Sequence, residues 1–136
     1  MRALPPTLAE PHVIAEEEAV TPEDFRRLAL SLPEAVEHSH MGTPDFRLRG
    51  KIFASLSESR SMATLKLQRG QQEMVCAAEP ALFSPVAGYW GASGWTDLRL
   101  GAADEAALRS ALRMAWRNVA PKRLLAEEDD AAEHRT

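Results

Sequence analysis

The sequence predicts an α+β fold, a two-layer α/β sandwich in which helices cover one face of an antiparallel sheet. Segments of alternating apolar and polar residues follow one another closely between residues 45 and 67, with connections too short for parallel crossovers. Apolar residues recur at helical spacing near each end of this region. The expected order of elements is therefore α-β-β-β-α-β-β-α.

The first helix is expected over residues 22–32. Thr21 can cap it, and Pro22 suits its first position because the N–H that proline lacks has no partner there. Phe25 and Leu28 begin an apolar stripe, and a proline ends the segment.

Three strands are expected next. Residues 34–44 have a loop composition, after which strict alternation over 45–49 predicts a strand with one apolar face. Gly50 separates this strand from a second one at 52–57. A polar cluster then leads into a third strand at 62–67. Together they form an antiparallel meander.

The second half of the chain alternates helices and strands. A short helix is expected over 71–78, and one more helical turn is possible over 80–83. The glycine-rich and aromatic stretch 88–95, which leads into 96–100, predicts two strands joined by a glycine turn.

The last helix has the clearest pattern. Asp104 caps it, and Pro121 ends it. Leu108, Leu112 and Trp116 fall on one stripe between these points, so we expect all three to pack in the core.

Charge divides the chain into three parts. The net charge is -4, but residues 21–125 hold 14 Lys and Arg against 11 Asp and Glu, which is +3. We expect residues 1–20 to be a flexible acidic leader, 21–125 to be one folded domain, and 126–136 to be an acidic disordered tail. A mildly basic body between acidic ends binds nucleic acid only where its cations cluster.

Nothing in the sequence indicates a membrane or an oxidising compartment. No apolar run approaches the ~18 to 20 residues that span a bilayer, and the N-terminus has no signal-peptide pattern. We therefore expect a cytoplasmic protein. Cys76 is the single cysteine, which excludes an internal disulfide and favours a packed thiol.

Two residue groups resemble chemical sites. His38 and His40, near Glu37 and Asp45, contain metal-binding residue types, but we expect them in a loop, where alternate residues share no face. We expect no metal.

The segment 91–95 resembles the nucleophile elbow around Ser93, although Trp95 stands where its second glycine is required. Phosphate-binding and dinucleotide-binding motifs are also absent from the sequence. We therefore expect no enzymatic activity and no cofactor.

Cations gather in the window 45–72, which carries six Lys and Arg against two acidic residues. Such side chains on hairpins can contact phosphates, and Phe53 or Tyr89 could stack on a base if exposed. The alternative is a solvated sheet face whose charges resist edge aggregation. The proposed contacts are Arg47, Arg49, Lys51, Lys66 and Arg69.

Several segments occur together in an order that resembles the MmcQ/YjbR family over about residues 21 to 123. They are T-P-E-D-F, P-D-F-R-L-R-G-K-I-F-A-S-L, G-Y-W-G-A-S-G-W-T-D-L-R-L and A-W-R-N-V-A-P-K. The resemblance implies an α-β3-α-β2-α fold similar to that of type III secretion chaperones.

The resemblance also implies DNA binding without enzymatic activity, through two hairpins that act as a double wing. In this chain the wings are the turns around Arg49-Gly50-Lys51 and around 58–61. They imply weak, largely sequence-independent contact with the DNA backbone. The chaperone-like fold implies a second possibility, a small adaptor that binds a protein segment and has no nucleic-acid role. Either protein would be a monomer or a weak homodimer.

Overall fold

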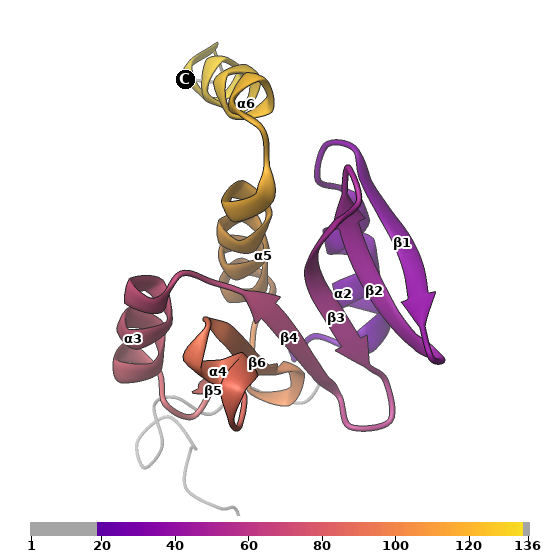
Figure 1. The fold of residues 1–136 in the computed structure, drawn as a ribbon, viewed down its shortest axis with the longest axis vertical. Coiled ribbons are helices and arrows are strands. Elements are labelled where there is room, and N and C mark those ends of the chain that lie inside the picture. The colour runs from indigo at the N-terminus through magenta and orange to yellow at the C-terminus, as the bar shows by residue number, and fades with distance from the viewer. Residues whose placement is uncertain (1–18, 135–136) are drawn as a thin grey trace, which may run out of the picture.

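A computed structural model describes residues 19–134, and the side chains as far as 130, so almost all of the predicted leader lies outside the described residues. Six strands form one antiparallel sheet in the order β1-β2-β3-β4-β6-β5 (Figure 1). The predicted fold class is confirmed. The strands are β1 (Ala35–His40), β2 (Thr43–Leu48), β3 (Lys51–Ser57), β4 (Met62–Lys66), β5 (Phe83–Pro85) and β6 (Trp95–Arg99).

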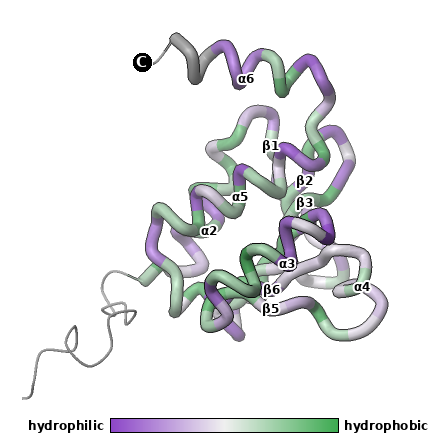
Figure 2. The backbone as a smooth tube through the Cα atoms, turned by 90° about the vertical axis from the view of Figure 1, so that its left-hand side faces the viewer, coloured by the Kyte–Doolittle hydropathy of each residue, from purple (hydrophilic) through white to green (hydrophobic). Residues whose placement is uncertain are grey.

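The helices belong mainly to one side of the sheet. In Figure 2, α2 and α5 lie on one side, and the short α4 lies on the other. No helix in the described part of the chain is long and apolar enough to cross a membrane. The helices are α2 (Pro22–Leu30), α3 (Arg69–Ala78), α4 (Tyr89–Ala92), the 3-10 turn η1 (Leu100–Ala102), α5 (Glu105–Val119) and α6 (Lys122–His134).

The core lies between the sheet and the helices α2 and α5. Phe46 in β2 and Leu65 in β4 point to this side, and both are fully buried. Phe25 of α2 packs edge-on against Phe46, with the ring centres 5.5 Å apart. Trp116 of α5 is also fully buried, and its indole N–H donates to the carbonyl of Pro33 at 3.0 Å. The predicted core position of Trp116 is confirmed.

Both long helices begin where the sequence predicted. Thr21 and Asp24 form a capping box, in which each side chain accepts a hydrogen bond from the backbone N–H of the other. Asp104 caps α5 by accepting from the N–H of Ala107 at 2.8 Å.

Strand β1 occupies a segment that was expected to be a loop. It pairs with β2 along its whole length, from Ala35 opposite Leu48 to His40 opposite Thr43. All but its first residue are exposed, so the apolar alternation that identifies a half-buried strand is absent. The turn Met41-Gly42 has positive φ at both residues, which is typical of a two-residue hairpin turn.

Residues 80–95 also differ from expectation. Residues 80–82 form a hydrogen-bonded turn, as was considered, but the short strand β5 follows it at once, and the glycine-rich stretch forms α4, where a strand was expected. Only β6 matches the expected strand. Glycine and aromatic residues are compatible with a tight helical turn, so composition did not distinguish the two structures.

The C-terminal segment is a helix rather than the expected disordered tail. Leu124 of α6 is 4% exposed, and Glu128 accepts from Arg113 at 3.0 Å and also pairs with Arg117. The acidic residues therefore meet basic residues of α5, which the local charge count of the tail did not reveal.

Candidate binding groove on the helix-free face of the sheet

Strand register places a polar row across the sheet face opposite α2 and α5, which no long helix of residues 19–134 covers and which we call the helix-free face. Asp45 pairs with Ser55, Ser55 with Thr64, and Thr64 with Asp97. Paired residues of adjacent strands point to the same face, so these four side chains form one line across four strands. His38 pairs with Asp45 and extends the line to β1.

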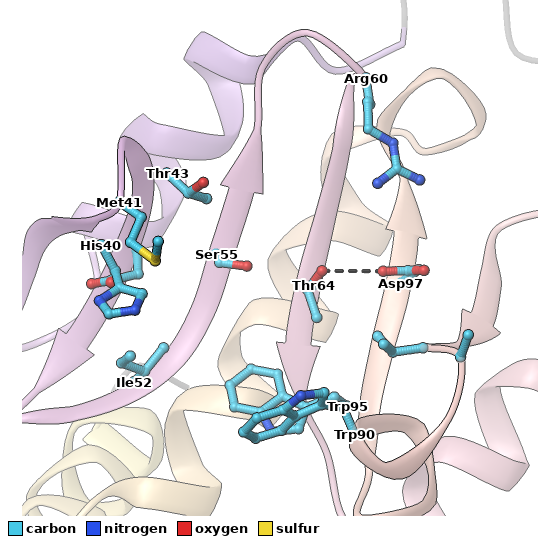
Figure 3. A pocket seen from close by; sticks show the side chains of 13 residues that line it. His40, Met41, Thr43, Ile52, Ser55, Arg60, Thr64, Trp90, Trp95 and Asp97 are labelled. Atoms are coloured by element: carbon cyan, nitrogen blue, oxygen red, sulfur yellow. Dashed lines mark hydrogen bonds between the residues drawn. The ribbon is translucent and has the colours of Figure 1, made fainter.

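A groove of about 660 Å³ lies over this row. The end of β1 and the β1–β2 turn, with His40 and Met41, lie at one side of it (Figure 3), and the loop with Val86 that leads into α4 also lines it. Its volume lies in the range of ~300 to 1,000 Å³ that is typical of small-ligand sites. We refer to it as the outer groove.

One end of the outer groove is aromatic. Trp90 of α4 meets Trp95 of β6 edge-on, with the ring centres 6.4 Å apart, and Tyr89 packs beside Trp90. Trp90 is 60% exposed and Tyr89 is 78% exposed. Lys66 places its ammonium group 5.4 Å from the ring centre of Trp95. Aromatic faces and a cation are thus available together.

Two glycines allow α4 to pack tightly beside the groove. A Cβ atom on Gly91 would lie 1.6 Å from the carbonyl oxygen of Val86, and one on Gly94 would lie 1.9 Å from that of Leu67. Gly94 also has a φ of +110, which L residues rarely adopt. The glycine-rich stretch therefore fixes the position of Trp90.

The middle of the outer groove carries two carboxylates that differ in their partners. Asp45 is 3% exposed and is held by Arg47, which donates from Nε to Oδ1 at 2.8 Å. Asp97 accepts a hydrogen bond from the Thr64 hydroxyl at 3.1 Å. Within residues 19–134, Asp97 has no ion-pair partner.

The opposite end of the outer groove is cationic. Arg60, from the β3–β4 turn, lies at the end away from the two tryptophans (Figure 3). Its guanidinium lies 3.8 Å from the sulfur of Met62 and pairs with no carboxylate of the described residues. This end is therefore suited to an anionic group.

Two of the five predicted phosphate contacts are hydrogen-bonded to carboxylates. Arg47 is held by Asp45, and Arg49 binds Glu34 through two hydrogen bonds, at 2.9 and 3.1 Å. These bonds raise the pKa of both arginines, and the bond from Arg49 lowers the pKa of Glu34. Arg49 lies in the turn after β2, so it does not share the sheet face with Arg47.

The other three predicted contacts lie in two places. Lys66 and Arg69 lie near the aromatic end, where they donate to the carbonyls of Ser93 at 3.4 Å and Ala92 at 3.0 Å. Arg69 also lies 3.6 Å from a carboxylate oxygen of Glu73. Lys51 pairs with buried Leu48, so it leaves the sheet on the helix side, where the described residues offer it no partner. Only Arg47 and Lys66 belong to the helix-free face itself.

The two predicted wings point away from each other. The turn Arg49-Gly50 lies at one end of β3, and the turn at 58–61 lies at the other. Consecutive hairpins of a meander always reverse at opposite ends, so these two turns cannot contact the same short stretch of duplex side by side.

Three other candidate residues can now be placed. His38 and His40 lie on a strand and share a face, contrary to the loop expectation, although no group of three metal-ligating side chains occurs in the described part of the chain. Ser93 donates from its hydroxyl to the carbonyl of Trp90 at 2.9 Å, at the end of α4. Phe53 is fully buried, so it cannot stack on a base.

The sequence analysis missed most residues of the outer groove. Arg60 lies in the basic window and in the predicted wing at 58–61 but was not among the five proposed contacts, and no local motif joins it to Thr64 and Asp97. Trp90 belongs to the glycine-rich stretch, whose unusual composition was the one available signal.

Comparison with known proteins identifies the family. The YjbR family model matches residues 30–118, which is more than half of the chain. The chain belongs to the YjbR family. The resemblance drawn from its motifs is thereby confirmed. No curated protein matches this YjbR chain.

A solved structure supports the fold of this YjbR chain. The crystal structure of Deinococcus radiodurans protein DR2400, with a domain named DUF419, superposes with a TM-score of 0.67 and 20% identity. The match covers 79% of the YjbR chain and 83% of the other protein. At this identity the similarity concerns the fold.

Proposed function

We propose that this chain is a non-enzymatic binding protein that holds single-stranded DNA weakly on the helix-free face of its sheet. The observation that carries the proposal is the exposed ring of Trp90, which packs edge-on against Trp95, the ring that Lys66 covers at the aromatic end of the outer groove. Proteins that bind single strands combine aromatic platforms, on which bases stack, with cations that follow the backbone.

The geometry favours a single strand over the predicted double wing on a duplex. The two hairpin turns lie at opposite ends of β3, and Arg47 and Arg49 already pair with carboxylates. Lys66 bonds only to a neutral carbonyl at the aromatic end and retains its net charge for a phosphate, whereas Arg69 donates to a carbonyl there and lies 3.6 Å from a carboxylate oxygen of Glu73. A base needs to be unpaired before it can stack on Trp90.

Fluorescence anisotropy with a labelled single strand of about 12 nucleotides of mixed sequence tests the proposal. Wild type should bind at about 50 mM salt, and Trp90→Ala should weaken binding about tenfold, because one base loses its stacking partner. Met74→Ala, which removes another exposed apolar side chain from α3, is the matched control and should bind as wild type does.

Absence of binding by wild type at that salt concentration would refute the DNA assignment. The protein-adaptor interpretation would then take its place. Equal binding by wild type and Trp90→Ala would refute the stacking platform.

A further inference from the structure

The outer groove presents three chemistries in a fixed order. Trp90 and Trp95 form an aromatic end, Asp97 lies in the middle, and Arg60 lies at the far end (Figure 3). A ligand that matches all three has a planar ring, a hydrogen-bond donor on or near the ring, and an anion at the other end. This order restricts the class of ligand more than the groove's volume does.

Asp97 determines whether the ligand donates or accepts the hydrogen bond in the middle of the groove. An ionised carboxylate only accepts hydrogen bonds, and the Thr64 hydroxyl occupies one position on Oδ1. Since no cation of the described residues neutralises Asp97, a ligand that supplies an N–H donor is favoured there. Asp45 differs, because Arg47 already satisfies it.

Arg60 determines the chemistry of the far end. Its guanidinium has no carboxylate partner in the described part of the chain, and its fork of donors matches a phosphate group. Arg60 and Asp97 lie on separate elements and both line the groove, so a ligand can offer its anion to one and its donor to the other.

We propose that the outer groove is a pocket for one nucleotide whose base carries an exocyclic amino group, such as adenosine monophosphate. The base stacks on Trp90, its amino group donates to Asp97, and the phosphate binds Arg60. This inference rests on the proposed function, since the same pocket would hold one base of a bound single strand. It adds a base preference that a stacking platform alone does not have.

Titration calorimetry with three free ligands tests the pocket. Adenosine monophosphate should bind about tenfold more tightly than inosine monophosphate, which has a carbonyl oxygen where adenine has the amino group. It should also bind about tenfold more tightly than adenosine, which lacks the phosphate.

Two variants separate the contacts. Asp97→Asn keeps an oxygen for Thr64 and turns an amide N–H₂ toward the ligand, so the preference should reverse in favour of inosine monophosphate. Arg60→Gln should reduce the affinity for adenosine monophosphate to that for adenosine. Arg123→Gln, which makes the same charge change on α6, should leave it unchanged.

The outcomes distinguish this inference from the proposed function. Single-stranded DNA that binds while adenosine monophosphate does not, or equal binding of adenosine and inosine monophosphates, would overturn the pocket and leave the proposed function standing. The expected ligand order without oligonucleotide binding would support the pocket and refute the DNA assignment. If neither the nucleotides nor the oligonucleotide binds, both fail.

Discussion

Trp116 joins the last sheet-covering helix to the chain that follows α2. Its ring is fully buried, and its N–H donates to the Pro33 carbonyl. Trp116→Ala should therefore cost about 3 to 5 kcal/mol in the free energy of unfolding. Trp116→Phe loses the same hydrogen bond but keeps an aromatic ring in the core, so its cost in the free energy of unfolding should be smaller. Urea denaturation measures both, and a loss below about 1 kcal/mol for alanine would contradict the core assignment.

Gly94 is a position where the addition of a single Cβ atom should destabilise the fold. Gly94→Ala would place a methyl group against the Leu67 carbonyl at a φ that alanine avoids, so we expect a loss of more than about 1 kcal/mol. Gly70→Ala is the matched control, because its Cβ meets nothing within 4 Å and it lies in α3. Thermal unfolding should show Gly70→Ala to be at least as stable as wild type. Equal stability of the two variants would contradict the close packing.

Single residues of the core were easier to predict than those of the outer groove. Trp116, Leu108 and Leu112 repeat along one helix, so their shared face follows from spacing alone. Asp97 and Arg60 line the same groove only because β3, β4 and β6 lie side by side, which depends on pairing between distant segments.

At the scale of elements, the capping box of α2 links stability to pH. The backbone N–H of Thr21 donates to Asp24, which lowers the pKa of that carboxyl below its ordinary 3.8. The ionised group therefore stabilises the fold above the unfolded pKa, and this contribution is lost as pH falls through the lower folded value.

Asp24→Asn should consequently reduce the loss of stability between pH 7 and about pH 3. Urea denaturation at the two pH values measures the change. Glu79→Gln, which removes an exposed carboxylate after α3, should leave the loss as in wild type. An identical loss in Asp24→Asn and wild type would contradict the linkage.

Helix α6 is held by a charged contact that can be weakened by one substitution. Glu128 pairs with both Arg113 and Arg117, so Glu128→Gln should increase the rate of proteolysis within α6. Glu127→Gln is the matched control, because its carboxylate only approaches Arg123 at 3.9 Å. Mass analysis of the fragments should show that cleavage after residue 121 occurs earlier in Glu128→Gln than in Glu127→Gln. Equal rates in the two variants would mean that the arginines do not hold the helix.

The elements that the sequence predicted share a periodic apolar stripe. Helices α2 and α5 and strands β2, β3, β4 and β6 bury one face and expose the other, which produces the pattern that was read. No side chain of strand β1 is fully buried. Helix α6 is held in part by ion pairs between its Glu128 and two arginines of α5. Their structures depend on neighbours, so local spacing did not reveal them.

At the scale of the whole molecule, the ion pairs limit the dependence of DNA binding on salt. With Arg47 and Arg49 engaged, about two or three phosphates are neutralised, which gives a slope of log affinity against log salt of about -1.4 to -2.1 on a single strand. Five free cations would give about -3.5.

Lys66→Gln should flatten this slope by about 0.7, because it removes one phosphate contact. Lys122→Gln makes the same charge change at the start of α6 and should keep the wild-type slope. Titrations of the labelled single strand at several salt concentrations measure the slopes. Equal slopes for the two variants would exclude Lys66 from the binding surface.

The sheet order also has a consequence for how the chain reaches its fold. Strands β1 to β4 pair with their immediate successors, but β4 pairs next with β6, across residues 67–94. Short hairpins close at little entropic cost, whereas the β4–β6 pairing must first order a much longer loop. We therefore expect the four-stranded meander to form early in refolding and the β4–β6 pairing to set the rate. Because Asp97 lies on β6, the outer groove would then be completed last.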